Sequence, residues 1–162
     1  MEEYNQIGGI KKMLDVKERS ALIEDILEKW QKILRLSEWK IKVSTGVHLH
    51  PKEKWGEIRI LDNIFRAEMD ISTLCPEEDL QEVVIHELLH LLTYPLRQFF
   101  YKTLQELTRP QEGKIIADEV AGKDEKLLGN LALSFLEMEH RIWLSKGIKS
   151  EILNRNEKEK EK

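Results

Sequence analysis

Residues 84–91 read Val84-Ile85-His86-Glu87-Leu88-Leu89-His90-Leu91. On a helix, positions i and i+4 lie on one face, so His86 and His90 can direct two imidazoles at one ion. Glu87 lies one step round the helix, within reach of a water molecule bound to that ion. The other side chains are apolar almost all round, which predicts a buried helix. The polar wedge of two histidines and a glutamate should therefore line a cleft.

Two imidazoles and a carboxylate are costly in a protein core unless they are paired or bind a metal. We interpret His86 and His90 as ligands of a zinc ion, and Glu87 as the catalytic general base. Zinc brings the pKa of a bound water close to ~7, and a nearby carboxylate can then take up the proton. The alternative is a pair of core histidines held by hydrogen bonds, with no metal.

A catalytic zinc ion usually has three protein ligands. We expect the third from a C-terminal helix over about residues 127–146, which offers Glu137, Glu139 and His140. Glu139 falls within the apolar stripe of this helix, so it is the predicted third ligand, with His140 as the second choice. Alternatively, Glu139 pairs with Arg141 or with a lysine at the edge of the stripe.

The remaining patterns predict an α+β domain. Helical spacing over 17–37 is followed by alternation typical of three strands, at 39–44, 55–61 and 64–71. We expect three further segments: a helix from Pro76 to a break or kink at Tyr94-Pro95, a helix over 96–107, and a loop or short helix over 108–126. The predicted organisation is a flexible leader (1–16), one domain (17–150) and a charged, disordered tail (151–162).

Composition narrows the possible partners. The net charge of −4 provides no strong basic field for nucleic acid, and no stretch approaches the ~18 apolar residues of a membrane span. The acidic N-terminus does not resemble a secretory signal, and the single cysteine cannot form an internal disulfide. We therefore expect a cytoplasmic protein that acts on a peptide or protein.

The order of helix, strands, His-Glu-Leu-Leu-His helix and late acidic helix resembles that of the zincin-like metallopeptidases of phage and prophage type, related to the SprT-like and ImmA/IrrE-like minimal zincins. The resemblance covers roughly residues 20–145. It implies a small sheet of three or slightly more strands packed on an N-terminal helix, a buried motif helix and a C-terminal helix. It also implies that a peptide substrate adds to an edge strand of the sheet, for which residues 64–71 are our candidate.

Three other protein classes share part of this pattern. A metzincin would have glycine at Thr93 and histidine at Leu96, which excludes that class. The YbeY-type endoribonucleases, which the two histidines and Leu91 also resemble, have glycine at Glu87 and a further histidine at Leu96. The alternative function is a non-catalytic, zincin-fold regulatory module of phage origin with structural zinc, but such a site needs no general base and Glu87 is present.

Overall fold

The structure is a computed structural model that describes residues 15–45, 54–62 and 65–160. Within these residues the fold is α+β, with three α-helices and a three-stranded mixed sheet. The order of elements is α1 (Val16–Ile33), β1 (Lys40–Thr45), β2 (Gly56–Asp62), β3 (Arg66–Ile71), the 3-10 turn η1 (Glu77–Asp79), α2 (Leu80–Leu107) and α3 (Pro110–Lys160).

Helix α1 begins at a capping box. The Asp15 side chain accepts hydrogen bonds from the backbone N–H groups of Lys17 and Glu18, and the Glu18 side chain accepts one from the N–H of Asp15. Asp15 and Val16 therefore belong to the first helix, although the sequence predicts them in the leader. Residues 1–14, the rest of that predicted leader, lie outside the described residues.

The strand order is β1-β3-β2, so β3 is the central strand. It pairs in parallel with β1 and antiparallel with β2. The prediction that residues 64–71 form a peptide-binding edge is therefore wrong, because both sides of β3 already carry backbone hydrogen bonds. The edges of the sheet are β1 and β2, and β2 is the edge strand that contacts α2.

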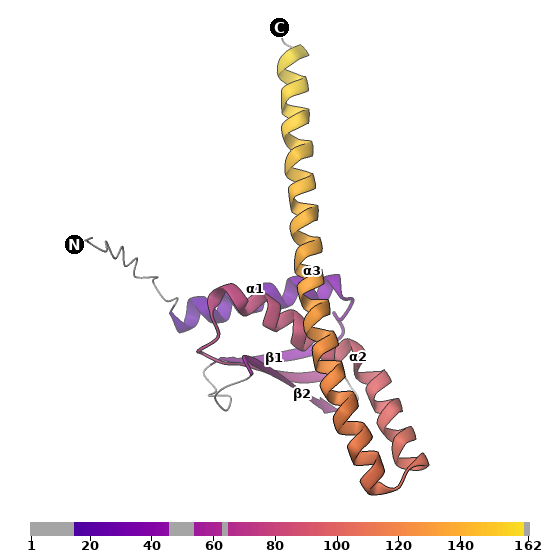
Figure 1. The fold of residues 1–162 in the computed structure, drawn as a ribbon. Coiled ribbons are helices and arrows are strands. Elements are labelled where there is room, and N and C mark those ends of the chain that lie inside the picture. The colour runs from indigo at the N-terminus through magenta and orange to yellow at the C-terminus, as the bar shows by residue number, and fades with distance from the viewer. Residues whose placement is uncertain (1–14, 46–53, 63–64, 161–162) are drawn as a thin grey trace, which may run out of the picture.

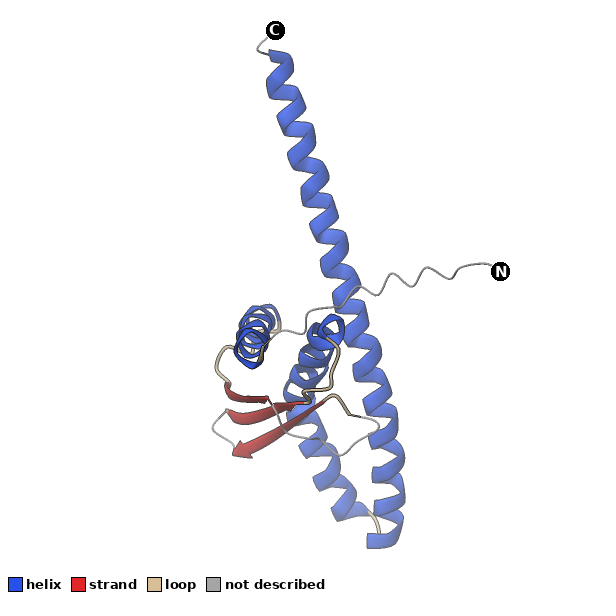
Figure 2. Ribbon diagram, turned by 90° about the vertical axis from the view of Figure 1, so that its left-hand side faces the viewer, coloured by secondary structure: helices blue, strands red, loops and turns tan. Residues whose placement is uncertain are grey.

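Helices α1 and α2 cover one face of the sheet, and α3 packs along α2 (Figures 1 and 2). The core lies between these layers. Its largest fully buried side chains come from all three helices and from β3. They are Ile23, Trp30, Met69, Ile71, Leu80, Val84, Ile85, Leu88, Leu89, Leu91 and Leu128.

Helix α2 continues through Pro95, where the sequence predicts a break or kink. Proline removes one backbone hydrogen bond, but its fixed φ is compatible with a helix, and residues 96–107 have helical spacing of their own. An ion pair between Arg97 and Asp124 also joins this second half to α3. One helix thus carries both the buried motif and a more exposed extension.

Helix α3 begins at Pro110 and includes residues 110–126, where the sequence predicts a loop or short helix. Pro110 and Glu112 lie in its first turn, where a missing N–H costs nothing and an acid is favourable. Residues that the sequence assigns to a loop or short helix therefore begin one long helix. The helix also runs through residues 151–160, which the sequence assigns to a disordered tail.

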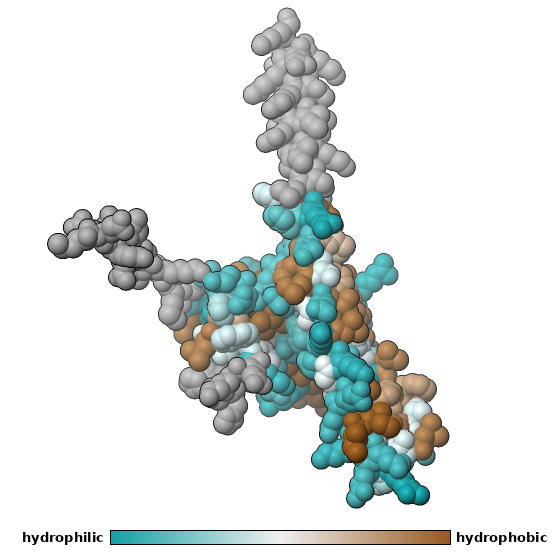
Figure 3. Space-filling view, viewed as in Figure 1, coloured by the Kyte–Doolittle hydropathy of each residue, from teal (hydrophilic) through white to brown (hydrophobic). Residues whose placement is uncertain are grey.

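Apolar side chains gather on the α2–α3 hairpin (Figure 3). Leu96 and Phe99 on α2 are 70% and 68% exposed, and Ile115 on α3 is 68% exposed. None of the described helices combines the length and the apolar character needed to cross a membrane.

Gly56 lets β2 lie close against α2. A Cβ at this position would be 2.6 Å from Cγ1 of Val83 and 3.0 Å from Oε1 of Glu87. We expect Gly56→Ala to lower the free energy of unfolding by about 1–3 kcal/mol, because β2 or α2 must move to admit the methyl group. Urea denaturation followed by circular dichroism measures the change.

The matched control is Gly122→Ala on α3, where an added Cβ meets nothing within 4 Å. This change should stabilise the protein by up to about 1 kcal/mol, because alanine favours the helix. Equal effects of the two substitutions would show that the β2–α2 contact is not tight at Gly56.

Candidate metal centre

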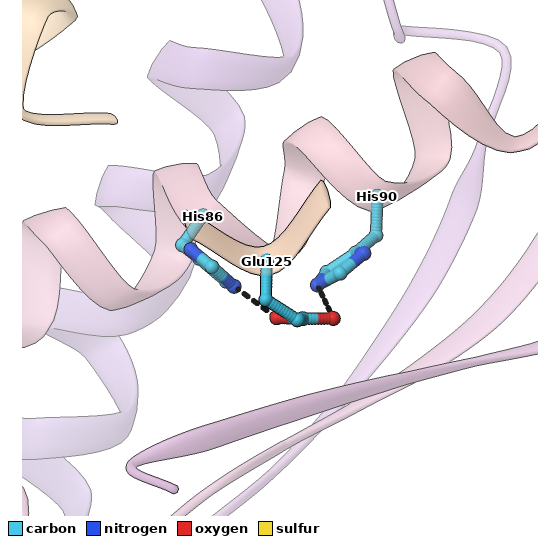
Figure 4. A group of neighbouring side chains, drawn as sticks. All are labelled: His86, His90 and Glu125. Carbon is cyan, nitrogen blue, oxygen red and sulfur yellow. Dashed lines mark hydrogen bonds and ion pairs between the residues drawn. The ribbon is translucent and has the colours of Figure 1, made fainter. Parts of the chain in front are cut away.

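Three side chains from two helices form a group that could hold a metal ion. His86 and His90 on α2 and Glu125 on α3 each offer one ligand atom, and these atoms lie within 4.8 Å of one another. Figure 4 shows the Glu125 carboxylate between the two imidazole rings. The ring centroids of His86 and His90 are 5.0 Å apart, so the i, i+4 spacing brings the two rings together as predicted.

The distances suit tetrahedral coordination. Nε2 of His86 is 3.2 Å from Oε2 of Glu125, and Nε2 of His90 is 3.5 Å from Oε1. Ligand atoms about 2.1 Å from a tetrahedral ion lie about 3.4 Å from one another. The two N–O distances, which involve different oxygens of Glu125, are close to this value. Three protein ligands would leave one position open for water or substrate.

Glu139, the predicted third ligand, lies elsewhere. Its carboxylate accepts a hydrogen bond from Nε2 of Gln81 at 2.7 Å and forms an ion pair with Lys29. Pairing with a lysine was the alternative that the sequence left open. His140, the second choice, is exposed and is not part of the metal-binding group.

Helical periodicity predicts the third ligand on the correct face of α3, but at the wrong position along the helix axis. Glu125 precedes Glu139 by 14 residues, which corresponds to nearly the same angle on a helix and about 21 Å along its axis. Extending the apolar stripe back from Leu128 by three residues would have reached Glu125. The sequence predicts this helix only from about residue 127, which places Glu125 in the predicted loop or short helix.

Glu87 is buried, with 6% of its surface exposed. Burial is the main cause that raises its pKa to about 7, and the nearby charge of Glu125 raises it further. A hydrogen bond from the backbone of Ile58 on β2 partly opposes this shift. A carboxyl with a pKa close to neutrality can both accept and release a proton under physiological conditions.

His90 contacts Arg97 in addition to His86 and Glu125. Nη1 of Arg97 lies 2.6 Å from Nδ1 of His90, and Nε of Arg97 lies 3.2 Å from Oδ2 of Asp124. Burial lowers the pKa of His90, His86 and Arg97 lower it further, and Glu125 opposes the change. His90 therefore favours the neutral form that binds metals.

The group lies in a cleft of about 820 Å³ between β2, α2 and α3. Gly56, Ile58 and Ile60 line it from β2, and Glu125 and Lys126 line it from α3. Helix α2 contributes one long face, made up of Glu82, Val83, His86, Glu87, His90, Tyr94, Arg97, Gln98 and Tyr101. The cleft has room for an extended ligand that reaches past the three candidate metal ligands.

Comparison with known proteins gives no relative: no protein-family model, curated protein or solved structure matches this chain.

Substitutions can test whether Glu125 or Glu139 is the third metal ligand. We expect Glu125→Ala to weaken zinc binding by about 100-fold or more, since loss of a direct ligand should cost at least as much as loss of an outer-shell partner. Glu139→Ala should leave the affinity within about threefold of wild type, although the loss of its contacts with Lys29 and Gln81 lowers the melting temperature. Competition with a chromophoric chelator measures both affinities. The opposite ranking would restore Glu139 as the ligand.

The pKa of Glu87 gives a pH dependence for the metal-free protein. Its folded pKa of about 7 exceeds the ordinary value of 4.5. The folded state therefore binds this proton more tightly than the unfolded state does, and stability is lost as the pH rises from 4.5 through 7. Glu87→Gln does not titrate, so its stability relative to wild type should increase by about 3 kcal/mol over this window.

Urea denaturation in the presence of a chelator, repeated between pH 4.5 and 8, measures this difference. Glu24→Gln on the exposed surface of α1 serves as the control and should show no comparable trend. A constant difference between Glu87→Gln and wild type across the range would contradict the raised pKa.

Proposed function

We propose that the protein is a zinc-dependent metallopeptidase of the zincin type, with His86, His90 and Glu125 as metal ligands and Glu87 as the general base. The observation that carries the proposal is the placement of the buried Glu87 carboxyl beside a His-His-Glu group in one cleft. Nitrogen and carboxylate donors suit zinc among the common divalent ions.

Zinc, when bound, would polarise the scissile carbonyl and make water more acidic. Glu87 then takes the proton from the attacking water and later donates it to the leaving amine. Both steps need a carboxylate within reach of the bound water, and Glu87 lies directly beside His86 in the wall of the same cleft. A purely structural zinc site has no use for such a group, so Glu87 favours a hydrolase over a non-catalytic module.

The substrate class follows from the edge of the sheet. Among the described strands, β2 pairs with β3 alone, and its residues Gly56, Ile58 and Ile60 line the cleft. An extended peptide can add to the free side of β2 through backbone hydrogen bonds. Its scissile bond would then pass Glu87, which already contacts the backbone of Ile58. Tyr94 and Tyr101 on the cleft wall are candidate donors to the developing oxyanion.

The test combines metal content with hydrolysis. Protein purified without added metal should contain close to one zinc ion per chain by mass spectrometry, and His86→Ala should remove it. Glu87→Gln should keep the zinc and lower hydrolysis of an unfolded protein or peptide library by at least about 100-fold.

Glu82→Gln is the matched control, because Glu82 lines the same cleft without belonging to the metal-binding group. It should retain both zinc and activity. Zinc binding with no hydrolysis in wild type and no effect of Glu87→Gln would favour the non-catalytic module. A chain that binds no divalent ion would rule out the metallopeptidase.

A further inference from the structure

Arg97 connects the candidate metal centre to a second carboxylate. It follows His90 by two helical turns on the same face of α2 and lies between His90 and Asp124 of α3. The side chains of Arg97 and Asp124 are only 29% and 19% exposed. Asp124 immediately precedes Glu125, so these contacts lie directly beside the three candidate ligands.

The contact between Arg97 and His90 defines which ring nitrogen carries the proton. A guanidinium group only donates hydrogen bonds, so Nδ1 of His90 must accept from Nη1 of Arg97. A neutral imidazole has a single N–H, which must then be on Nε2. This is the nitrogen that faces Oε1 of Glu125 at 3.5 Å. The hydrogen bonds of the group are consistent with this tautomer.

A metal ion bound between Glu125 and the two histidines requires the other tautomer. If Nε2 of His90 holds the ion, its lone pair would be used for that bond, and the remaining proton of His90 would be on Nδ1. There it would point at an N–H of Arg97, and two donors cannot form a hydrogen bond. The present contact of Arg97 with His90 and occupation of the centre therefore exclude each other.

We infer that Arg97 is a positioning residue that competes with the metal ion for His90. This inference rests on the proposed zinc centre and adds an exchange of partners to it. When the ion binds, Arg97 releases Nδ1, and Asp124 accepts the new Nδ1–H. Asp124 is already bound to Arg97, and its charge already acts on His90. A carboxylate in this role orients a metal-binding histidine and increases its basicity.

Substitutions of Arg97 and of Asp124 should therefore have opposite effects on zinc affinity. Arg97→Met keeps an apolar stem but removes the competing donors, and should tighten zinc binding by about three- to tenfold. Arg97→Gln offers an amide oxygen that can accept the Nδ1–H, and should tighten it at least as much. Asp124→Ala removes the acceptor and should weaken binding by about tenfold or more. Arg141→Met on the exposed part of α3 is the control for loss of one positive charge and should change little.

Two measurements test the inference on the full-length protein. Long-range ¹H–¹⁵N spectra of the metal-free protein should show the Nε2–H tautomer of His90 in wild type, and a shift toward Nδ1–H in Arg97→Met and Arg97→Gln. Titration with zinc alone against a chromophoric chelator should give the order of affinities described above. Circular dichroism confirms that each variant is folded.

The outcomes separate this inference from the proposed function. An Nδ1–H tautomer in metal-free wild type overturns the competition, whatever the zinc affinities are. Tight zinc binding in wild type with no change in either Arg97 variant also overturns it, and leaves the metallopeptidase intact. A wild-type protein that binds no zinc overturns both.

Discussion

The packing of α3 along α2 is the contact on which the candidate site depends. The buried side chains of Leu128 and Ala132 on α3 belong to the same core as the motif helix. One helical turn before Leu128, this packing brings Glu125 to His86 and His90. Helix α2 supplies two of the three candidate ligands, and α3 supplies the third.

The part of the site that lies within one helix could be predicted from sequence. His86, Glu87 and His90 are related by helical spacing alone, and the apolar residues around them indicate burial. The position of Glu125 depends on where α3 begins and on how α3 packs. Neither can be inferred from the residues next to Glu125 in the sequence. Pro110 and Gly113 suggested a loop, whereas Pro110 is compatible with a first helical turn.

The three strands were predicted from their alternating patterns, but their order was not. A sheet with one covered face gives the same alternation in central and edge strands. In β3, Ala67, Met69 and Ile71 face the core, while Glu68 and Asp70 pair with Arg59 of β2 across the strands. Sequence gave no reason to place β3 in the centre. The neighbours of a strand are defined by tertiary packing, which here leaves β2 as the edge beside Glu87.

Glu139 adds to the core contacts of Leu128 and Ala132 that hold α3 in its rotation about its own axis. It shares a helical face with Glu125, and it is held by Lys29 from α1 and Gln81 from the first turn of α2. A helix resists twisting, so any rotation that turns Glu125 away from the histidines also pulls Glu139 from both of its partners. Helix α1 contributes no candidate ligand, yet through Lys29 it helps to determine the angle at which the third carboxylate meets the two imidazoles.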